Sequence, residues 1–511
     1  MMIPRPARPL HLSVLLPLAA LFGAGAFALV APPDAAAQQR LSLDEAIELA
    51  LASNPGLRAT LNEEEVADWD VRAARGALVL PTLGLGSGVS WQGAGEERIG
   101  GLTSGELGLG GQPSFLFSSY SLGVNYSVSG VSLRAPALAR ASREAARARG
   151  SRAEVDLVLR VTQAYLDFAR QNEALELARR QVARAEANLN LARGMEAVGS
   201  ATPLEAMQAD IQAGRAGVAM MEAEQGIRTS RLALLRTIGL EQDRAAVPGD
   251  PLALGRIEWD EEELARLAMA SSPDLETLRA GVAVASGRVA SARAGYLPSL
   301  SVQAGWSGFT RQARNDGFIL GQVERQAEQL VAQCEFQNEI YRRLADPFPP
   351  QNCSQFLLTD EQRAGALDRN RQFPVDFTRQ PPQASISLSV PVFQGMERRR
   401  QVETARIEEE NARLRLREQE FGLRSDIASL LASARTALAL AELEERNVEV
   451  AEAQLRLARG EFEVGSGTFL QVAEAETVAA QADRDRLDAA FRYHETLARL
   501  EALVGSRLRR P

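Results

Sequence analysis

The sequence predicts an α+β membrane protein that is built from long helices, four strands and two internal repeats. Charged residues make up 24% of the 511 residues and aromatic residues only 5%, while Ala, Leu, Arg and Glu fill long uninterrupted runs, as in extended helices. Four short segments alternate strictly between apolar and small polar side chains, which indicates strands. Motifs from the first half of the chain return in the second half in the same order, which indicates a duplication.

The first 37 residues have the features of a secretory signal peptide. Arg5 and Arg8 precede an apolar stretch, and Ala35 and Ala37 then form an A-x-A cleavage pattern. We expect cleavage near Ala37, with an uncleaved membrane anchor as the alternative. Past this segment there is no run of about 18 apolar residues, so the mature chain can cross a membrane only as β-strands.

The duplication is clearest in a turn motif. The stretch LARGMEAVGSATPLEAMQAD begins at Leu191, and LARGEFEVGSGTFLQVAEAE begins at Leu457, an offset of 266 residues. Earlier in each half, ALASNPGLRA around Asn54 matches AMASSPDLET around Ser272, an offset of 218. Because the offset increases, the second half must contain an insertion. We therefore expect a first repeat over residues 38–248, a linker over 249–259 and a second repeat over 260–511.

Each repeat contains two expected strands, near residues 82–92 and 119–130 and near 299–308 and 384–393. In the first strand Leu83 and Leu85 share one face, while Gly84 and Gly86 share the other. The polar faces carry Ser and Gly rather than charges, and aromatic residues lie near the strand ends, which favours a membrane barrel over a soluble sandwich. Because open sheet edges are not tolerated in lipid, several chains must each contribute four strands.

A long helical hairpin follows the second strand of each repeat. The turns are expected near residues 194–203 and 460–469, and a helix of sixty residues would be about 90 Å long. Apolar residues recur every seven positions in both halves, which predicts seams between packed helices. These residues are Val161, Phe168, Leu175, Val182 and Leu189 in the first half, and Leu443, Val450, Leu457 and Val464 in the second. A fibrous coiled coil would explain the seams but not the strands.

The chain resembles the TolC-like outer-membrane efflux proteins over nearly its whole mature length. The resemblance rests on the duplicated order of helix, strand, strand and helix, on the strand entries LPTLGLGSG and LPSLSVQAG, and on FEVGSGTFLQVAEAE with its first-half counterpart. It implies a homotrimer that shares one 12-stranded β-barrel in the outer membrane, with four strands from each chain. A long periplasmic α-helical coiled-coil barrel would continue from that barrel.

The same resemblance implies a function and partners. The chain would be the outer-membrane duct of a tripartite efflux or type I secretion system, and it would conduct substrates passively to the cell exterior. Its partners would be outer-membrane lipid, a periplasmic adaptor (membrane fusion) protein and an inner-membrane pump of the RND or ABC type. The alternative is an outer-membrane or periplasmic coiled-coil scaffold or adaptor protein without channel activity.

The resemblance also implies site residues at the periplasmic tip. Glu205, Gln471 and Glu474 match positions that line the aperture, where carboxylates would bind cations. Glu205 and Glu474 fit equally well as acids stabilised by the dipole of the first helical turn. Phe462 and Gly467 stand where a closing network has a Tyr and an Arg, so a weaker or differently held gate is expected. The turns that would dock the adaptor contain Val198, Gly199, Ser200, Thr202, Val464, Gly465, Ser466 and Thr468.

The insertion is expected over residues 309–383, as an extracellular loop. It contains both cysteines of the chain, Cys334 and Cys353, which lie close together in sequence. An exported protein meets an oxidising compartment, so we expect them to form a disulfide within the loop. Neither cysteine has a neighbouring His or Cys, which argues against a metal site.

Other functions find little support in the sequence. The two histidines are His11, in the expected signal peptide, and His494, near the end of the chain, and no nucleophile elbow, P-loop or metal-ligand cluster is visible. We therefore expect neither an enzyme nor a cofactor. The net charge of −9 and the lack of a basic cluster argue against nucleic-acid binding.

Overall fold

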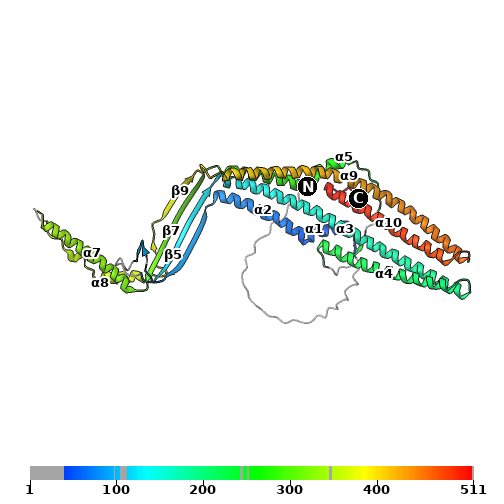
Figure 1. Ribbon diagram of the computed structural model, residues 1–511, viewed down its shortest axis with the longest axis horizontal. Helices are drawn as coiled ribbons and strands as arrows, with labels where there is room; N and C mark the ends of the chain where they lie inside the picture. The colour runs from blue at the N-terminus through cyan, green and yellow to red at the C-terminus, as the bar shows by residue number, and fades with distance from the viewer. Residues whose placement is uncertain are drawn as a thin grey trace, which may run out of the picture.

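The protein is elongated, with helices at one end, a curved sheet in the middle and a small helical lobe at the other end (Figure 1). The computed structural model describes residues 39–96, 98–103, 112–241, 246–249, 253–344 and 348–508. The expected signal peptide, residues 1–37, lies outside the described residues. None of the described helices has a segment long and apolar enough to cross a membrane.

Groups of helices and strands alternate along the chain. The helices are α1 (Leu43–Ser53), α2 (Pro55–Val79), α3 (Gly130–Ala197), α4 (Pro203–Ile238), α5 (Glu261–Ser271), α6 (Pro273–Ala294), α7 (Asp316–Arg342), η1 (Cys353–Phe356), α8 (Asp360–Asn370), α9 (Glu397–Glu463) and α10 (Phe469–Val504). The strands are β1 (Gln39–Leu41), β2 (Thr82–Gln92), β3 (Arg98–Ile99), β4 (Leu102–Thr103), β5 (Phe115–Val128), β6 (Ala246–Pro248), β7 (Ser299–Ala313), β8 (Thr378–Arg379) and β9 (Gln383–Ser389).

Prolines separate the two short helices at the start of each half. Pro55 and Pro273 occupy the first turns of α2 and α6, where a missing N–H costs nothing and the ring fits the helical φ. The residue before each proline is extended, so α1 ends at Ser53 and α5 ends at Ser271. Asn54 also caps α2 by accepting a hydrogen bond from the N–H of Leu57 at 2.9 Å.

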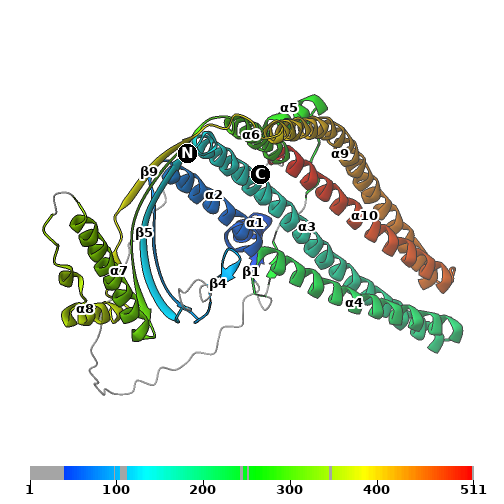
Figure 2. The same ribbon diagram turned by 60° about the vertical axis from the view of Figure 1, so that its left-hand side comes forward.

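The long helices α3 and α9 organise the helical part into one layer. Near the sheet the neighbours run in the order α2, α3, α6 and α9, and toward the far tip the order is α4, α3, α10 and α9. Figure 2 shows α3 with α4 and α9 with α10 as two hairpins that end at the same tip. The helices α4 and α9 are therefore the two outer edges of the layer near the tip.

Three large apolar clusters and a small one, which joins Leu166 and Ala169 of α3 to Phe491 of α10, hold this layer together. One joins α1 and α2 to α3 and α4 around Ile47, Leu57 and Tyr165, and its counterpart in the second half joins α5, α9 and α10 around Leu264 and Leu500. The third lies between the hairpins near the tip. Each large side chain that is fully buried contributes about 1.5–3 kcal/mol.

The seven-residue pattern of the second half does not form a seam within the chain. In α3, Val161 and Phe168 are buried as expected. In α9, however, Leu443, Val450 and Leu457 are 44%, 68% and 65% exposed. The side of α9 that packs on α10 instead carries Ala451, Leu455 and Phe462. No described helix of the same chain covers this part of the expected seam, so an apolar stripe remains open on the outer edge of the helical layer.

The four expected strands form one antiparallel sheet in the order β2, β5, β7 and β9. Across the sheet, the register places apolar residues beside apolar residues and glycine or polar residues beside one another. One row contains Leu83, Val124, Ala304 and Ala384, and the next row, on the opposite face, contains Gly84, Gly123, Gly305 and Gln383. Over most of its length the sheet therefore has one apolar face and one face of Gly, Ser, Asn and Gln, and at the end next to α7 this second face carries Phe115, Phe117, Phe309 and Arg311.

The strands differ from the expected bounds at their ends. β5 begins at Phe115 rather than near residue 119, and β7 continues to Ala313 because its last residues pair with the start of β5. β9 ends at Ser389 rather than near residue 393, since Pro391 has no N–H to continue the ladder.

The insertion is not a simple loop. Its first residues extend β7, and most of the remainder forms α7 and α8, which pack together as a lobe beyond the sheet (Figure 1). A disulfide joins Cys334 of α7 to Cys353 of η1, which packs against α7. The side-chain amide of Asn370 bonds both backbone groups of Ala313 and so fixes α8 to the end of β7.

Candidate functional site at the helical tip

Two turns of the same geometry form the tip. Val198–Thr202 connects α3 to α4, and Val464–Thr468 connects α9 to α10. In the first turn the N–H of Ser200 donates to the carbonyl of Met195 at 2.8 Å, and in the second the N–H of Ser466 donates to the carbonyl of Glu461 at 2.9 Å. Both turns depend on a glycine with left-handed backbone, Gly199 with φ of 75° and Gly465 with φ of 74°. The eight residues expected to dock the adaptor all lie in these turns.

A capping box follows each turn and involves two of the expected aperture residues. The N–H of Thr202 donates to the Glu205 carboxylate at 2.7 Å, and the N–H of Glu205 donates to the Thr202 hydroxyl at 3.3 Å. Thr468 and Gln471 repeat the arrangement, with distances of 2.8 Å and 3.5 Å. Two N–H groups that no helical carbonyl can reach are thereby satisfied at each helix start. Glu205 and Gln471 therefore cap helices, whatever else they do.

The cap lowers the pKa of Glu205. The main cause is the hydrogen bond from the backbone N–H of Thr202, opposed by partial burial and reinforced by the Thr202 hydroxyl and by the backbone N–H of Phe469. Phe469 is the first residue of α10, so the carboxylate also contacts the start of the other hairpin's second helix. Sequence reasoning placed the negative charge correctly in the first turn of α4 but did not find this second contact.

The two positions expected beside a gate are structural in this chain. Phe462 is 3% exposed and stacks edge to face on Phe469, with ring centroids 5.8 Å apart. Gly467 lies against Glu461, whose Cβ is 3.0 Å from where a Gly467 side chain would begin. Glu474, by contrast, is exposed in the second turn of α10.

A polar cluster that sequence reasoning missed lies between the two hairpins. Arg459 of α9 pairs with Glu476 of α10 at 3.4 Å and donates to the side-chain carbonyl of Asn188 on α3 at 2.8 Å. The side-chain amide of Asn188 donates in turn to the Glu476 carboxylate. A second ion pair, Arg184 with Asp483 at 3.6 Å, joins α3 to α10 nearby.

Burial shifts the pKa of the carboxyl group in this cluster. Desolvation raises the pKa of Glu476, and the charge of Arg459, the Asn188 hydrogen bond and the charge of Arg184 oppose that rise without cancelling it. One feature of the sequence indicates this cluster, namely an Arg and an acidic residue that recur at the same spacing in both halves. Arg459 and Glu476 lie 266 residues after Arg193 and Asp210, which form an exposed ion pair at 3.1 Å in the first hairpin.

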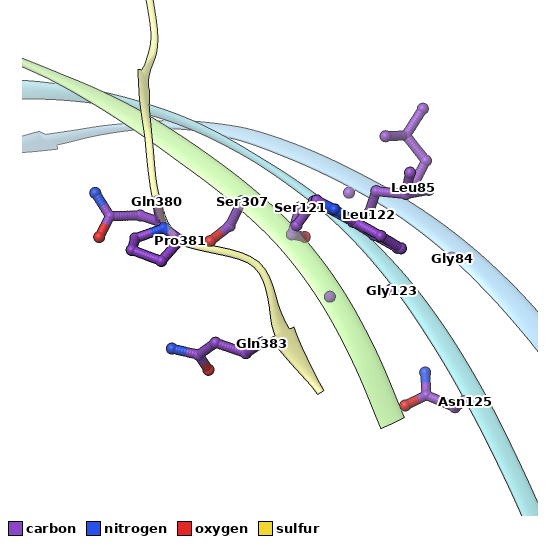
Figure 3. Close-up of a pocket in the computed structure, with 13 residues that line it drawn as sticks. Gly84, Leu85, Ser121, Leu122, Gly123, Asn125, Ser307, Gln380, Pro381 and Gln383 are labelled. Atoms are coloured by element: carbon purple, nitrogen blue, oxygen red, sulfur yellow. The ribbon is translucent and has the colours of Figure 1, made fainter. Parts of the chain in front are cut away.

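The described residues of the tip do not form a metal site. Across the described part of the chain, no group of three or more His, Cys, Asp or Glu is placed to hold a metal ion. A hollow of about 670 Å³ lies instead on the polar face of the sheet. Figure 3 shows that this face is concave, with Asn125 and Gln383 on it and Leu85 on the opposite side.

The sequence agrees with this geometry. A family model described as outer membrane efflux protein matches residues 46–240 and 373–506. The chain belongs to the outer membrane efflux protein family. Most of the insertion, including α7 and α8, falls between the two matched ranges. A comparison with curated proteins gave no match.

Solved structures of outer-membrane channels share the fold. The chain is similar to the CmeC outer membrane channel of Campylobacter jejuni, with a TM-score of 0.65, 12% identity, and 91% of this chain and 85% of that one covered. The open state of the Neisseria gonorrhoeae MtrE channel is similar with a TM-score of 0.61 and 19% identity, and the match covers 91% of this chain and 89% of that one. The outer membrane protein VceC of Vibrio cholerae is similar with a TM-score of 0.60 and 17% identity, and the match covers 91% of this chain and 97% of that one. The family and these structures are channels, not enzymes.

Proposed function

We propose that three copies of this efflux protein form one duct through the outer membrane and the periplasm, with each copy contributing four strands to a 12-stranded β-barrel. The observation that carries the proposal is that the layer of helices and the sheet are both open at both edges. Ring closure by identical copies removes every open edge at once. The two repeats of each chain would make the ring nearly sixfold at the tip.

The helical edges support this closure through apolar stripes. On α9 the open stripe contains Leu443, Val450, Leu457 and Val464, and on α4 it contains Leu204, Met207, Ile211, Val218 and Met221. All of these side chains are at least 44% exposed, and seven-residue steps recur within each stripe. Such steps are those of a coiled-coil seam. In a ring, α9 of one copy meets α4 of the next.

The edge strands support the same closure. β2 and β9 are the two edges of the sheet along its length, and each presents unpaired backbone groups. Lipid cannot satisfy those groups, so strands of neighbouring copies must pair with them. The convex face that carries Leu83, Leu85, Ile386 and Leu388 would then face lipid, since these side chains are 67–79% exposed in the single chain. The concave face of Gly, Ser, Asn and Gln would line the lumen.

The tip suits contact with a periplasmic adaptor, and through it with an inner-membrane pump of the RND or ABC type. Both turns are exposed and share one backbone geometry, so a ring of three copies would present six similar docking positions. Glu205 and Glu474 would add negative charge around the aperture. The cluster of Arg459, Glu476 and Asn188 would hold the second hairpin against α3 and so keep the aperture narrow.

Conductance of the purified protein in planar bilayers tests the proposal. A trimer by light scattering that gives stable ion conductance is the expected result. A monomer that stays in the periplasmic fraction would refute the duct, and it would favour a coiled-coil scaffold or adaptor protein instead. Tripartite efflux and type I secretion are distinguished by which pump co-purifies with the protein after cross-linking.

A further inference from the structure

One charged residue stands out among the four long strands of the sheet, and the Arg379 of the two-residue strand β8 (Thr378–Arg379) pairs with Gly308 on the other face. Strands β2, β5, β7 and β9 contain no Asp, Glu, Lys or Arg except Arg311 of β7. Arg311 pairs directly with Phe117 of β5, and it lies on the same face as Ser307 and Gly305 because residues two apart share a face. This is the concave polar face that contains the hollow of Figure 3. Arg311 lies toward its far end, next to the lobe of α7 and α8.

The Arg311 side chain is held in place by aromatic rings. Its guanidinium carbon lies 3.4 Å from the centroid of Phe115 and 5.4 Å from that of Phe117. Phe318 of α7 packs edge to face on Phe115, with ring centroids 6.1 Å apart and an interplanar angle of 80°. The cation is thus stacked rather than free to swing, and the side chain still remains exposed.

No carboxylate neutralises this cation within the described residues, because none of their ion pairs includes Arg311. The acidic residue closest along the described chain is Asp316, and its carboxylate accepts a hydrogen bond from the Asn370 side-chain amide at 2.9 Å. A stacked, exposed and uncompensated cation on an otherwise uncharged face creates a local positive potential that attracts anions.

We propose that Arg311 is a specificity-determining residue, which places a ring of positive charge just inside the outer mouth of the duct and favours the passage of anionic solutes. This inference rests on the proposed duct, in which three copies bring three such cations to one level of the lumen. Rings of charged side chains are a common device for ionic selectivity in pores. Here the ring would be at the exit, at the opposite end of the molecule from the acidic residues of the tip.

The test is the reversal potential of single channels under a potassium chloride gradient. Arg311→Gln should lower the ratio of chloride to potassium permeability by about twofold or more near 0.1 M salt, where the Debye length is about 10 Å. In 1 M salt, where that length is about 3 Å, the difference should nearly vanish. Arg311→Lys keeps the charge and should keep most of the preference. Arg342→Gln removes an exposed charge at the end of α7 and serves as the matched control.

The outcomes separate the two proposals. A wild-type protein that gives no conductance overturns the duct itself. Normal conductance with an unchanged reversal potential in Arg311→Gln overturns only the role of Arg311. An equal shift in Arg342→Gln would also overturn it, because a general change in surface charge would then explain the result.

Discussion

Arg459 and Glu476 form an ion pair in the second hairpin that Arg193 and Asp210 repeat in the first, 266 residues earlier. The side chains of Arg459 and Glu476 are 29% and 17% exposed, whereas those of Arg193 and Asp210 are 57% and 63% exposed. The difference arises because α10 of the second hairpin packs on α3, which brings Asn188 onto the pair. The same repeated pair therefore differs in strength between the two hairpins, since water screens an exposed ion pair more than a mostly buried one.

Removing Arg459 should loosen the tip, and removing Arg193 should not. Arg459→Ala leaves the Glu476 carboxylate largely buried without its cation, which should cost about 1–3 kcal/mol, less than for a fully buried pair because both side chains retain some exposure. Arg193→Ala should cost less than about 1 kcal/mol. Guanidinium-induced loss of helical circular dichroism measures the stability of each variant, and single-channel conductance, which should rise only for Arg459→Ala, reports the aperture. Equal effects of the two variants would contradict the buried link.

Acid should tighten the tip rather than open it. Burial raises the folded pKa of Glu476 above the usual glutamate value of 4.5, so the packed hairpins bind the proton more strongly than a state in which Glu476 is solvated. The stabilisation from protonation is fully present below pH 4.5 and is lost as the pH rises through the raised folded pKa. Conductance should therefore fall as the pH is lowered through that window. In Glu476→Gln this part of the pH dependence should disappear; a wild-type channel that opens in acid would contradict the sign.

Charge and capping at Glu205 can be separated by two substitutions. Glu205→Gln keeps an acceptor for the Thr202 N–H, as Gln471 does in the other turn, whereas Glu205→Ala removes it and should cost about 1 kcal/mol or less at this partly exposed position. Hydrogen exchange of the peptide that spans residues 198–206 should therefore accelerate in the Ala variant alone.

The charge of Glu205 makes the stability of the first turn depend on pH. Because the pKa of Glu205 is lowered, its carboxylate stabilises the turn above pH 4.5, and this contribution is lost as the pH falls through the lowered folded value.

Glu474→Ala removes a carboxylate but no cap, so hydrogen exchange of the tip should be unchanged while channel block by divalent cations weakens. Unchanged block in both Glu474→Ala and Glu205→Gln would exclude an acidic aperture.

The sequence indicates which short segments form strands and turns, but it does not indicate which elements pack against one another. The alternation around Leu83 and the glycines of the two turns each follow from one short segment, so these elements lie close to where the sequence places them. The stripe through Leu457 is different, because periodicity identifies an apolar face without saying whether the covering helix belongs to the same chain. The buried position of Phe462 and the link from Asn188 to Glu476 depend on how two hairpins pack, which no single segment encodes.

A charge on the open stripe of α9 should prevent assembly without unfolding the chain. Leu457 is 65% exposed in one copy, so Leu457→Glu places the carboxylate in water there but would bury it against α4 of the neighbour in the proposed ring. We expect a helical monomer by light scattering and circular dichroism. Arg456→Gln changes the charge by the same amount beside the stripe and should remain trimeric. A trimeric Leu457→Glu protein would show that this edge is not an interface.

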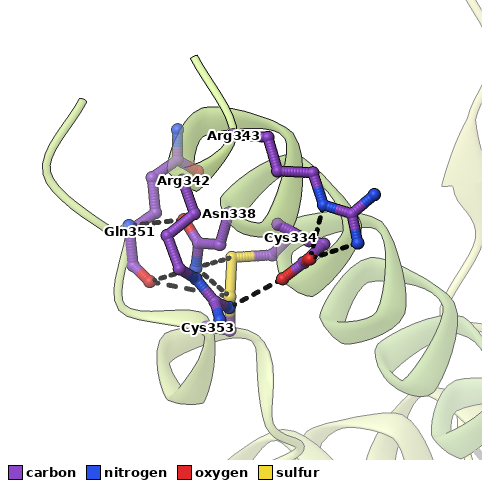
Figure 4. Close-up of polar contacts among 7 residues, drawn as sticks. Cys334, Asn338, Arg342, Arg343, Gln351 and Cys353 are labelled. Carbon is purple, nitrogen blue, oxygen red and sulfur yellow. Dashed lines mark hydrogen bonds and ion pairs between the residues drawn. A yellow bond between two sulfur atoms is a disulfide. The ribbon is translucent and has the colours of Figure 1, made fainter. Parts of the chain in front are cut away.

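The disulfide should stabilise the lobe alone. Cys334 and Cys353 close a segment of 19 residues, which corresponds to about 3 kcal/mol in the chain-entropy description. Figure 4 shows Asn338 beside the disulfide, where its side-chain amide donates to the Gln351 carbonyl at 2.8 Å and its side-chain carbonyl accepts from the Gln351 N–H at 2.7 Å. Replacing both cysteines by Ser should therefore increase trypsin cleavage after the exposed Arg342 and Arg343, while trimer content and conductance stay at wild-type levels, because the lobe meets the sheet at the end of β7 and the start of β5, away from the disulfide. A loss of conductance on reduction would instead show that the lobe helps to form the outer mouth.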